Sequence, residues 1–510
     1  MDPTMEQTGP HEQSALAMLL RGILALYALH FFGSIIYGAY LGPLSKYPGP
    51  KLNAATAIPF WYNTLRGRQT TWIQGLHRRY GTVVRLSPLR LSYIDAQAWK
   101  DIYGHRTGGR KATVKDPKFY NKPVNGVNSL VTEPDDDEHG RVRKIFSNAF
   151  SHRALIEQEA QIRTYVDLLI AKTRENIANG GGDAKKATFD LVKLYNFTTF
   201  DIMADLTFGE PLHQLESSQY SPWVSAIFGG FKAGDMARIT QEYPVLRYVY
   251  RTLVPKRLLE MRKQHFQHAV DRVERRLAAA PPPGKADIWE LVLRDGGKLD
   301  ADKMHSNAAL FMLAGTETTA TLLSGLTWYL LRNPEKMKKL VGEIRGAFTS
   351  EEEMNLVNLQ QLKYLDACVH EGLRLYPPVP IGGPRQTPEG GAVICGKWVP
   401  GGTTVFVSQY SAYHSPLNFR DPDSLIPERW LDGTGFEKDS KDVLQPFSFG
   451  PRNCLGKNLA YHEIRLILAR TLWAFDIELC EESLNWINQK SWTLWDKPPL
   501  MARLIPANKT

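Results

Sequence analysis

A long apolar run lies near the N-terminus of the chain. Residues 23–41 include no Lys, Arg, Asp or Glu, and their apolar pattern is interrupted by His30 and Ser34. A helix of about 20 apolar residues spans a bilayer. Acidic residues precede this run and basic residues follow it, and the basic flank of a membrane helix remains in the cytoplasm. The pattern predicts residues 1–22 as a short lumenal N-terminus, 23–41 as one transmembrane helix, 42–51 as a stiff Pro/Gly hinge and 52–510 as a cytoplasmic domain, with a cleaved signal peptide as the alternative.

The rest of the chain is patterned mainly for helices. Residues 303–331 contain no proline and many strong helix formers, and Asn333-Pro334 ends the pattern. Residues 189–208 and 457–475 also have helical patterns. Residues 83–94 (VVRLSPLRLSYI) are rich in β-forming residues around a proline, which is typical of a hairpin. We expect a mainly α fold with a small β region.

The composition limits the possible domain organisation, binding partners and cellular compartment of the protein, but it does not identify its function. The 510 residues are 43% hydrophobic and 23% charged, with no linker or repeat, so one large domain is expected after the anchor. The net charge of +9 is spread along the chain, which does not indicate nucleic acid. The positive charge could form a basic face that binds an acidic protein partner or anionic lipid. It could equally serve only to keep the protein soluble. Four cysteines without a pairing pattern favour a reducing compartment.

One cysteine has unusual surroundings. Cys454 lies in the turn-rich stretch FSFGPRNCLG, directly before a helical pattern. A helix N-terminus favours a thiolate over a thiol. With no second cysteine nearby, a single axial metal ligand fits this loop better than a zinc cage or a disulfide.

This stretch resembles the haem-binding loop of the cytochrome P450 haem-thiolate monooxygenases. Phe447, Gly450, Cys454 and Gly456 stand at the matching positions, and the resemblance runs from about residue 47 to the C-terminus. It implies the cytochrome P450 fold, haem b (iron protoporphyrin IX) as cofactor, Cys454 as the iron ligand, and Phe447 beside the haem.

A second motif lies in the middle of the predicted long helix. Residues 314–319 read AGTETT; a glycine within a helix costs about 1 kcal/mol relative to alanine, and an acid within an apolar helix is unusual. The motif is similar to the family's oxygen-activating signature. That resemblance implies that Ala314 and Gly315 leave room for dioxygen, and that Glu317 and Thr318 deliver protons.

Further residues are assigned by the resemblance. Arg143, Arg385 and Arg452 are expected to bind the haem propionates. His139 stands four residues before Arg143, where the family often has tryptophan, which leaves the role of His139 less defined. Glu371, Arg374 and Arg429 match the family's buried Glu-Arg-Arg cluster, because Glu371 and Arg374 share one helix face and Arg429 lies in a PERW motif.

The substrate pocket is expected where the family places it. The loop of residues 104–133, an extended segment after Pro378 and a turn near the C-terminus are its candidate walls. The candidate pocket residues are Phe119, Val124, Val127, Val379, Ile381 and Thr493. Residues 223–250 correspond to the mobile lid of the family.

Electrons must come from another protein. The chain has no complete GxGxxG fingerprint, and about 56 residues after Cys454 are too few for a flavin domain. The resemblance implies NADPH–cytochrome P450 reductase as partner, with cytochrome b5 as a second candidate, and Lys144 and Lys457 as candidate docking residues. It also implies a single-pass monomer in the endoplasmic reticulum membrane, with the catalytic domain in the cytoplasm.

The expected reaction is insertion of one oxygen atom from O2 into a C–H bond of a small apolar substrate. The chain is similar to fungal enzymes of the isotrichodermin C-15 hydroxylase type, which suggests a terpenoid or polyketide intermediate of secondary metabolism, including mycotoxin pathways. Two alternatives remain: a haem-thiolate isomerase or dehydratase that needs no reductase, and a non-enzymatic haem-binding membrane protein. The Glu317-Thr318 pair argues against the isomerase or dehydratase.

Overall fold

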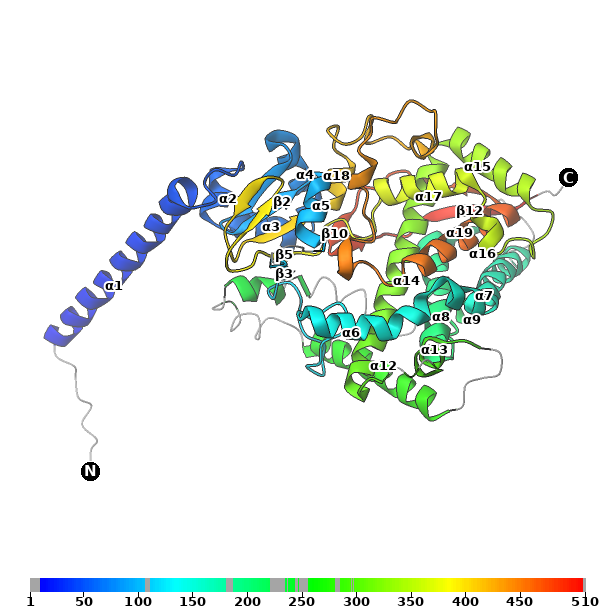
Figure 1. The fold of residues 1–510 in the computed structure, drawn as a ribbon, viewed down its shortest axis with the longest axis horizontal. Coiled ribbons are helices and arrows are strands. Elements are labelled where there is room, and N and C mark those ends of the chain that lie inside the picture. Colours follow the sequence, from blue (N-terminus) through cyan, green and yellow to red (C-terminus); the bar gives the residue numbers. More distant parts are fainter. Residues whose placement is uncertain are drawn as a thin grey trace.

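A computed structural model describes residues 10–105, 111–179, 187–220, 234–243 except 236, 246, 256–279, 285–294, 296 and 298–507. Helices dominate, and short strands form small sheets (Figure 1). The mainly α fold with a small β region is therefore confirmed. Most of the lid predicted at residues 223–250 lies outside the described residues.

The larger helices are α1 (Pro10–Ile36), α3 (Ile58–Leu65), α4 (Gln69–Tyr80), α5 (Ala96–Tyr103), α6 (Asp136–Ser147), α7 (His152–Asn179), α8 (Leu191–Phe208), α12 (Lys256–Ala278), α13 (Ile288–Arg294), α14 (Ala301–Leu331), α15 (Pro334–Ala347), α17 (Lys363–Leu375) and α19 (Lys457–Ala474). Shorter ones are α2 (Lys51–Ala55), α9 (Gln214–Ser217), α16 (Leu356–Leu359) and α18 (Gln409–Tyr413). The strands are β1 (Val83–Ser87), β2 (Arg90–Tyr93), β3 (Val114–Lys115), β4 (Thr188–Asp190), β5 (Arg385–Gln386), β6 (Ala392–Ile394), β7 (Lys397–Val399), β8 (Thr404–Val407), β9 (Phe475–Leu479), β10 (Lys490–Trp492), β11 (Leu494–Asp496) and β12 (Met501–Pro506).

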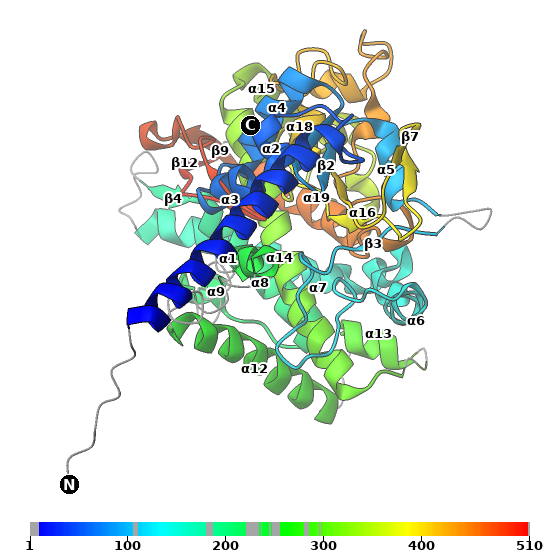
Figure 2. The ribbon, with the colours of Figure 1, turned by 90° about the vertical axis from the view of Figure 1, so that its left-hand side faces the viewer.

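Helix α1 projects away from the body of the protein, with the N-terminus at its far end (Figures 1 and 2). A π-helical turn, Tyr37–Leu41, continues it, and Arg21–Leu41 is long and apolar enough to cross a membrane. The segment that follows is packed on the domain: Leu44 is 1% exposed, and Arg85 Nη1 donates to the Gly38 carbonyl at 2.7 Å. Gly38 permits this approach, since a Cβ there would lie 2.9 Å from the Ala54 carbonyl oxygen.

The largest sheet has the strand order β1-β2-β8-β5-β3. β1 and β2 form the antiparallel hairpin that the sequence predicts, and β8 pairs with β2 in parallel. At the other edge β3 pairs antiparallel with β5, which sets Lys115 opposite Arg385. This pairing joins two segments that are 270 residues apart in the sequence, and it brings two basic side chains to the same place.

Helix α14 runs through the middle of the helical body (Figure 2). The Asp300 carboxylate caps it by accepting from the Lys303 N–H at 2.7 Å, so the helix begins slightly before the predicted boundary. Gly315 packs closely on α8: a Cβ there would lie 2.6 Å from Met203 Sδ, so the methionine side chain would have to move. Neighbouring helices therefore cover most of α14, and Ala314, Gly315 and Thr318 face a cavity.

The residues of the expected Glu-Arg-Arg cluster lie together and are fully buried. Arg374 donates to both carboxylate oxygens of Glu371, at 2.8 and 2.9 Å. The indole of Trp430 donates to Glu371 at 2.9 Å, and Arg429 lies 3.5 Å from the same carboxylate while it pairs with Asp439. Breaking a buried pair of this kind costs about 3–5 kcal/mol, because one charge stays uncompensated.

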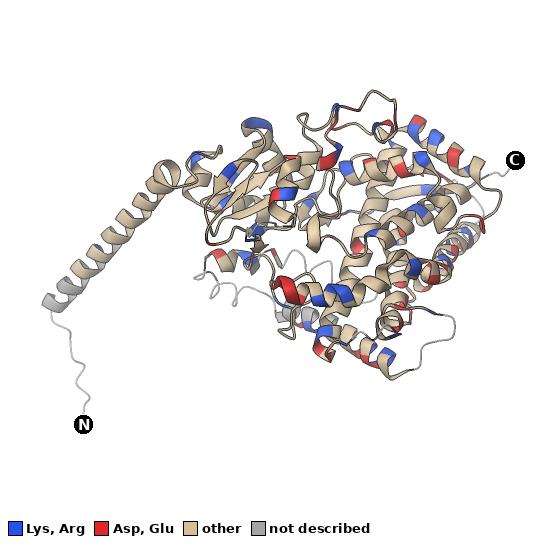
Figure 3. Ribbon diagram, viewed as in Figure 1, with Lys and Arg blue, Asp and Glu red and all other residues tan. Residues whose placement is uncertain are grey.

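Charged side chains of both signs are interspersed over the body, as Figure 3 shows. The described part of α1 is almost free of them, with Arg21 near its middle. This contrast agrees with an apolar helix in lipid and a body in water.

Candidate active site

A cavity of about 1590 Å³, counting its open mouth, lies between α14 and the loop that precedes α19. The loop is held in shape by the Cys454 N–H, which donates to the Phe447 carbonyl at 2.8 Å, and by Gly450 at φ +76°. A Cβ on Gly450 would lie 2.0 Å from the Tyr103 carbonyl oxygen, so glycine is required there. Cys454 lines the cavity and its side chain is exposed to it.

The thiol of Cys454 differs from our expectation in one respect. Burial of the group raises its pKa, and the Gly456 N–H, Arg143 and Lys457 only partly oppose this effect. The position before the helix N-terminus by itself therefore does not lower the pKa of Cys454 below its ordinary value. A coordinated metal cation deprotonates a thiol outright, so iron binding itself would supply the missing stabilisation.

One edge of the cavity is basic. Arg143, Arg385, Arg452 and His139 line it, as expected, and so does Lys115. Arg143 donates to the carbonyl and side-chain oxygens of Asn453, both at 2.6 Å, which fixes it beside Cys454. Arg385 Nε is buried and has no partner among the described residues.

Two members of this edge are less free to bind an anion. Arg452 donates to the carboxylate of Asp136 at 2.7 Å and to the carbonyls of Glu133 and Pro134. Burial, aided by Arg452 and Lys115, lowers the pKa of His139 to about 3, so its ring is neutral and offers a hydrogen bond without a charge.

Lys115 is a functional candidate that sequence reasoning missed. Burial and then Arg452 and Arg385 lower its pKa to about 6, and its Nζ donates to the Leu130 carbonyl at 3.2 Å. A lone lysine in an irregular loop gives no signal in a sequence. Its position depends on the β3–β5 pairing.

The side chains of the two expected proton-delivery residues, Glu317 and Thr318, point to different places. Thr318 lines the cavity, and its hydroxyl donates to the Ala314 carbonyl at 2.7 Å. Glu317 does not line the cavity: its side chain is 3% exposed and pairs with Lys497. Consecutive helix residues point in directions about 100° apart, which separates the two side chains.

Glu463 on α19 is a buried carboxyl that lines the same cavity. It is 1% exposed, its Oε1 has no partner among the described residues, and burial raises its pKa to about 8 against a weaker effect of a hydrogen bond with Thr319. The group is therefore protonated at neutral pH. An acid within an apolar helix was the signal that singled out Glu317, and the same signal was available for Glu463.

Of the six expected pocket residues, four line one or the other of two cavities and two line neither. Val379 lines the main cavity. Phe119, Ile381 and Thr493 line a smaller neighbouring cavity of about 620 Å³, again counting its open mouth. Val124, which is 41% exposed, and Val127 line neither of them.

The main cavity fits a haem by its chemistry. It has one accessible thiol, apolar walls from residues such as Phe447 and Leu459, and a basic edge for two propionates. The unpartnered Arg385 Nε and the exposed sulfur are two polar groups that a haem would satisfy. A large apolar pocket with a few convergent polar groups is the usual form of a cofactor site.

Together these features define a haem-thiolate protein. The family model described as Cytochrome P450 matches residues 48–503, and the chain belongs to this family. The chain is 47% identical over 493 residues to the cytochrome P450 monooxygenase efuB of Hormonema carpetanum, covering 96% of each chain. It is 47% identical over 477 residues to the cytochrome P450 monooxygenase FUM2 of Gibberella moniliformis, covering 93% of this chain and 100% of the relative. It is also 44% identical over 472 residues to the cytochrome P450 monooxygenase AMT3 of Alternaria alternata, covering 92% of this chain and 95% of the relative.

The chain is therefore an oxidoreductase, a haem-thiolate monooxygenase. The alternatives of an isomerase or dehydratase and of a non-enzymatic haem protein are not favoured. The roles of individual residues stay predictions.

Proposed function

We propose that the protein inserts one oxygen atom from O2 into a C–H bond of an apolar secondary-metabolite intermediate, a terpenoid or a polyketide. The observation that carries this proposal is that Cys454 and Thr318 line one large apolar cavity from two different elements. Haem iron bound to the Cys454 thiolate supplies the oxygen activation.

The residues of the chain hold the cofactor and the substrate. Arg143 and Arg385 bind the propionates by charge-assisted hydrogen bonds, and His139 donates a further one. Val379 and the apolar wall exclude water from the reacting C–H bond. The Thr318 hydroxyl donates to the Ala314 carbonyl at rest, and by turning about its Cα–Cβ bond it donates to oxygen in the cavity and passes a proton to it.

Glu317 supports this step indirectly. Its pairing with Lys497 holds the middle of α14 in place, and its second carboxylate oxygen, Oε2, has no partner among the described residues. A water chain from that oxygen to Thr318 would make Glu317 the proton source. Glu463, protonated and beside Thr319, is an alternative source on the same cavity.

Electrons come from NADPH through NADPH–cytochrome P450 reductase, with cytochrome b5 as a second donor. The apolar span Arg21–Leu41 supports an anchor in the endoplasmic reticulum membrane, with a monomeric catalytic domain on the cytoplasmic side. Lys144 and Lys457 remain the candidate docking residues.

Turnover with isotopically labelled dioxygen tests the proposal. Membranes containing the protein, the reductase and NADPH are incubated with candidate terpenoid and polyketide intermediates, and products are analysed by mass spectrometry. We expect one labelled oxygen atom per product, and no product without the reductase. Product that forms without the reductase, or that carries no label, would contradict the proposal.

A further inference from the structure

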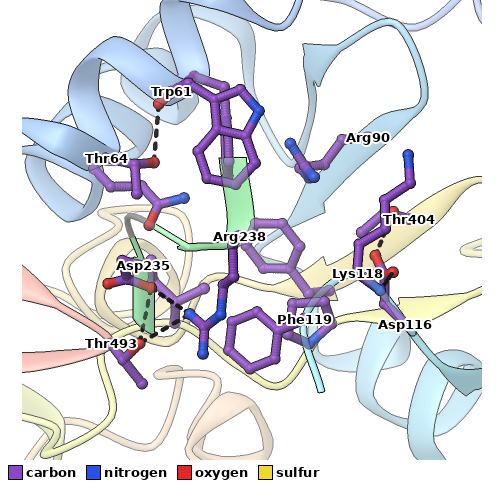
Figure 4. Close-up of a pocket in the computed structure, with 15 residues that line it drawn as sticks. Trp61, Thr64, Arg90, Asp116, Lys118, Phe119, Asp235, Arg238, Thr404 and Thr493 are labelled. Atoms are coloured by element: carbon purple, nitrogen blue, oxygen red, sulfur yellow. Dashed lines mark hydrogen bonds and ion pairs between the residues drawn. The ribbon is translucent and has the colours of Figure 1, made fainter. Parts of the chain in front are cut away.

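The smaller cavity has a lining of its own. Figure 4 shows its lining, which comes from α3, β2, the loop after β3 and the segment around Arg238. It adjoins the main cavity across a shared wall, because Phe119 and Pro384 face the smaller cavity while their neighbours Tyr120 and Arg385 face the main one.

Three hydrogen-bond donors in this lining are unsatisfied. Trp61 Nε1, Arg90 Nη1 and Arg238 Nε are buried and have no partner among the described residues. No buried side-chain acceptor of the lining is left without a partner in that same part of the chain. A buried polar group without a partner destabilises the fold, so three such donors in one cavity point to a ligand that brings acceptors.

Arg90 is the centre of the site. It is 7% exposed, and its guanidinium lies over the Phe60 ring at 4.0 Å and within 5.9 Å of the Trp61 ring centroid. Its carboxylate contact, with Glu242, is 3.4 Å long, beyond the usual range for a charge-assisted hydrogen bond. Figure 4 shows the guanidinium beside the indole of Trp61.

The other charged groups of the cavity are already engaged. Asp116 accepts from the Thr404 hydroxyl at 2.7 Å and from the Lys118 N–H at 2.9 Å. Asp235 pairs with Arg238 and accepts from Thr493 at 3.2 Å. The cations Arg90, Lys118 and Arg238 balance Asp116, Asp235 and Glu242 in number. The preference for an acceptor thus comes from the free donors and not from net charge.

The position of the cavity suggests how a ligand arrives. Helix α3 lines it with Phe60, Trp61 and Thr64 and turns Ile58 and Tyr62, 61% and 53% exposed, to the outside. This helix follows the apolar span Arg21–Leu41 closely in the chain, and a bilayer that holds that span would lie near the apolar outer face of α3. An amphipathic acid in a bilayer keeps its charged end at the headgroups, next to this cavity.

We propose that the substrate carries an acidic group, a carboxylate, which binds to Arg90, Arg238 and Trp61 in the smaller cavity while the apolar part extends across the shared wall into the main cavity. This inference rests on the proposed function, since it adds a substrate class to the same enzyme. A planar carboxylate suits Arg90 because a guanidinium presents parallel N–H donors, and Trp61 adds a third donor beside it. The acidic end would fix which C–H bond reaches the reaction centre.

Binding measurements test this without turnover. The full-length holoenzyme in neutral detergent is titrated by calorimetry with straight-chain acids from octanoate to palmitate and with the matching methyl esters. We expect at least one acid to bind about tenfold more tightly than its ester, as a charge-assisted contact predicts. Arg90→Gln and Arg238→Gln should each remove most of this preference.

Matched variants control for a change in overall charge and for misfolding. Arg79→Gln, at an exposed arginine outside the cavity, should keep the full preference for the acid. Trp61→Phe removes one N–H and keeps the ring, so it should weaken acid binding even if Arg90→Gln does not fold.

Two results would overturn the proposal. One is equal affinity for acids and esters, or a preference that survives in Arg90→Gln/Arg238→Gln. The other is competition by glycerophosphoglycerol at equal affinity, because the occupant would then be a lipid headgroup. The calorimetry needs no reductase and no product, so its failure leaves the proposed function intact.

Discussion

Glu317 and Lys497 form an ion pair inside the protein, and each side chain is 3% exposed. The Lys497 ammonium also donates to the Thr321 hydroxyl at 2.7 Å. The pair fastens the centre of α14 to the C-terminal segment before β12. Burial raises the pKa of Glu317, and Lys497 opposes this by its charge and by a hydrogen bond. The acid of the oxygen-activating motif is thus held away from the cavity by a lysine 180 residues further along the chain.

Replacing Lys497 alone should lower the stability of the protein more than replacing Lys497 and Glu317 together. Lys497→Met leaves a buried carboxylate without its cation, and we expect a loss of about 3–5 kcal/mol in the free energy of unfolding. The double variant Glu317→Gln/Lys497→Met should recover most of this loss, because no buried charge remains. Denaturant unfolding of Lys497→Met, of Glu317→Gln and of the double variant measures the coupling between the two side chains. A Lys497→Met protein as stable as the wild type would show that the ion pair does not stabilise the fold.

The hydroxyl of Thr318 should matter for coupling and not for haem binding. In Thr318→Ala we expect normal haem content, but the fraction of consumed NADPH that appears as oxygenated product should fall by about 10-fold or more, with hydrogen peroxide released instead. Thr316→Ala is the matched control, since the Thr316 hydroxyl also donates to a helix carbonyl, at 2.7 Å, but is fully buried outside the cavity. Tight coupling in Thr318→Ala would remove Thr318 from proton delivery.

Glu463 should make stability depend on pH. Its pKa is raised from 4.5 to about 8 in the folded protein, so the folded state keeps a proton that the unfolded state releases. Stability is therefore full below the unfolded pKa and declines by roughly 1.4 kcal/mol per pH unit, at most, as the pH rises towards 8. Glu463→Gln should flatten this decline in the thermal midpoint between about pH 5 and about pH 8. Glu482→Gln, at an exposed glutamate, should not change it. An unchanged slope in Glu463→Gln would mean that Glu463 is ionised in the fold.

The anchor can be separated from the domain at a defined place. Deleting residues 1–36 removes α1 and keeps the Gly38 carbonyl and Leu44, which pack on the body. We expect this protein in the supernatant after alkaline carbonate extraction, with wild-type stability. Deleting residues 1–46 should release it as well but lower stability by about 1–3 kcal/mol, because Arg85 loses an acceptor and a core side chain is lost. Sedimentation of both truncated proteins with membranes would show a second membrane attachment.

The sequence predicted those functional residues that belong to short local motifs. It did not predict residues whose partners are distant in the sequence and meet them only in the folded protein. Cys454 and Thr318 belong to short motifs whose chemistry is readable from a few neighbouring residues. Lys497 and Lys115 have no such context, because their partners are contributed by distant segments through packing and strand pairing. The division of Phe119 and Val379 between two cavities was equally hidden, since a sequence does not say on which side of a shared wall a residue lies.

The packing of the segment that precedes the domain was also not predictable from the sequence. Residues 42–51 were expected to be a hinge because of their prolines and glycines, yet Leu44 is 1% exposed within the core cluster that includes β2. Pro and Gly indicate where a helix stops, but not whether the chain beyond it packs. The fold class, by contrast, followed from helical periodicity, which is a property of each segment alone.

The most direct test concerns the sulfur of Cys454. The ferrous carbon monoxide complex of a haem with a thiolate ligand has a strongly red-shifted Soret band, which is lost when another group replaces the thiolate. We predict this band for the purified wild-type protein and its absence in Cys454→Ser, while Cys480→Ser, at a buried cysteine away from the cavity, keeps it. Retention of the band in Cys454→Ser would contradict the assignment of Cys454 as the haem ligand.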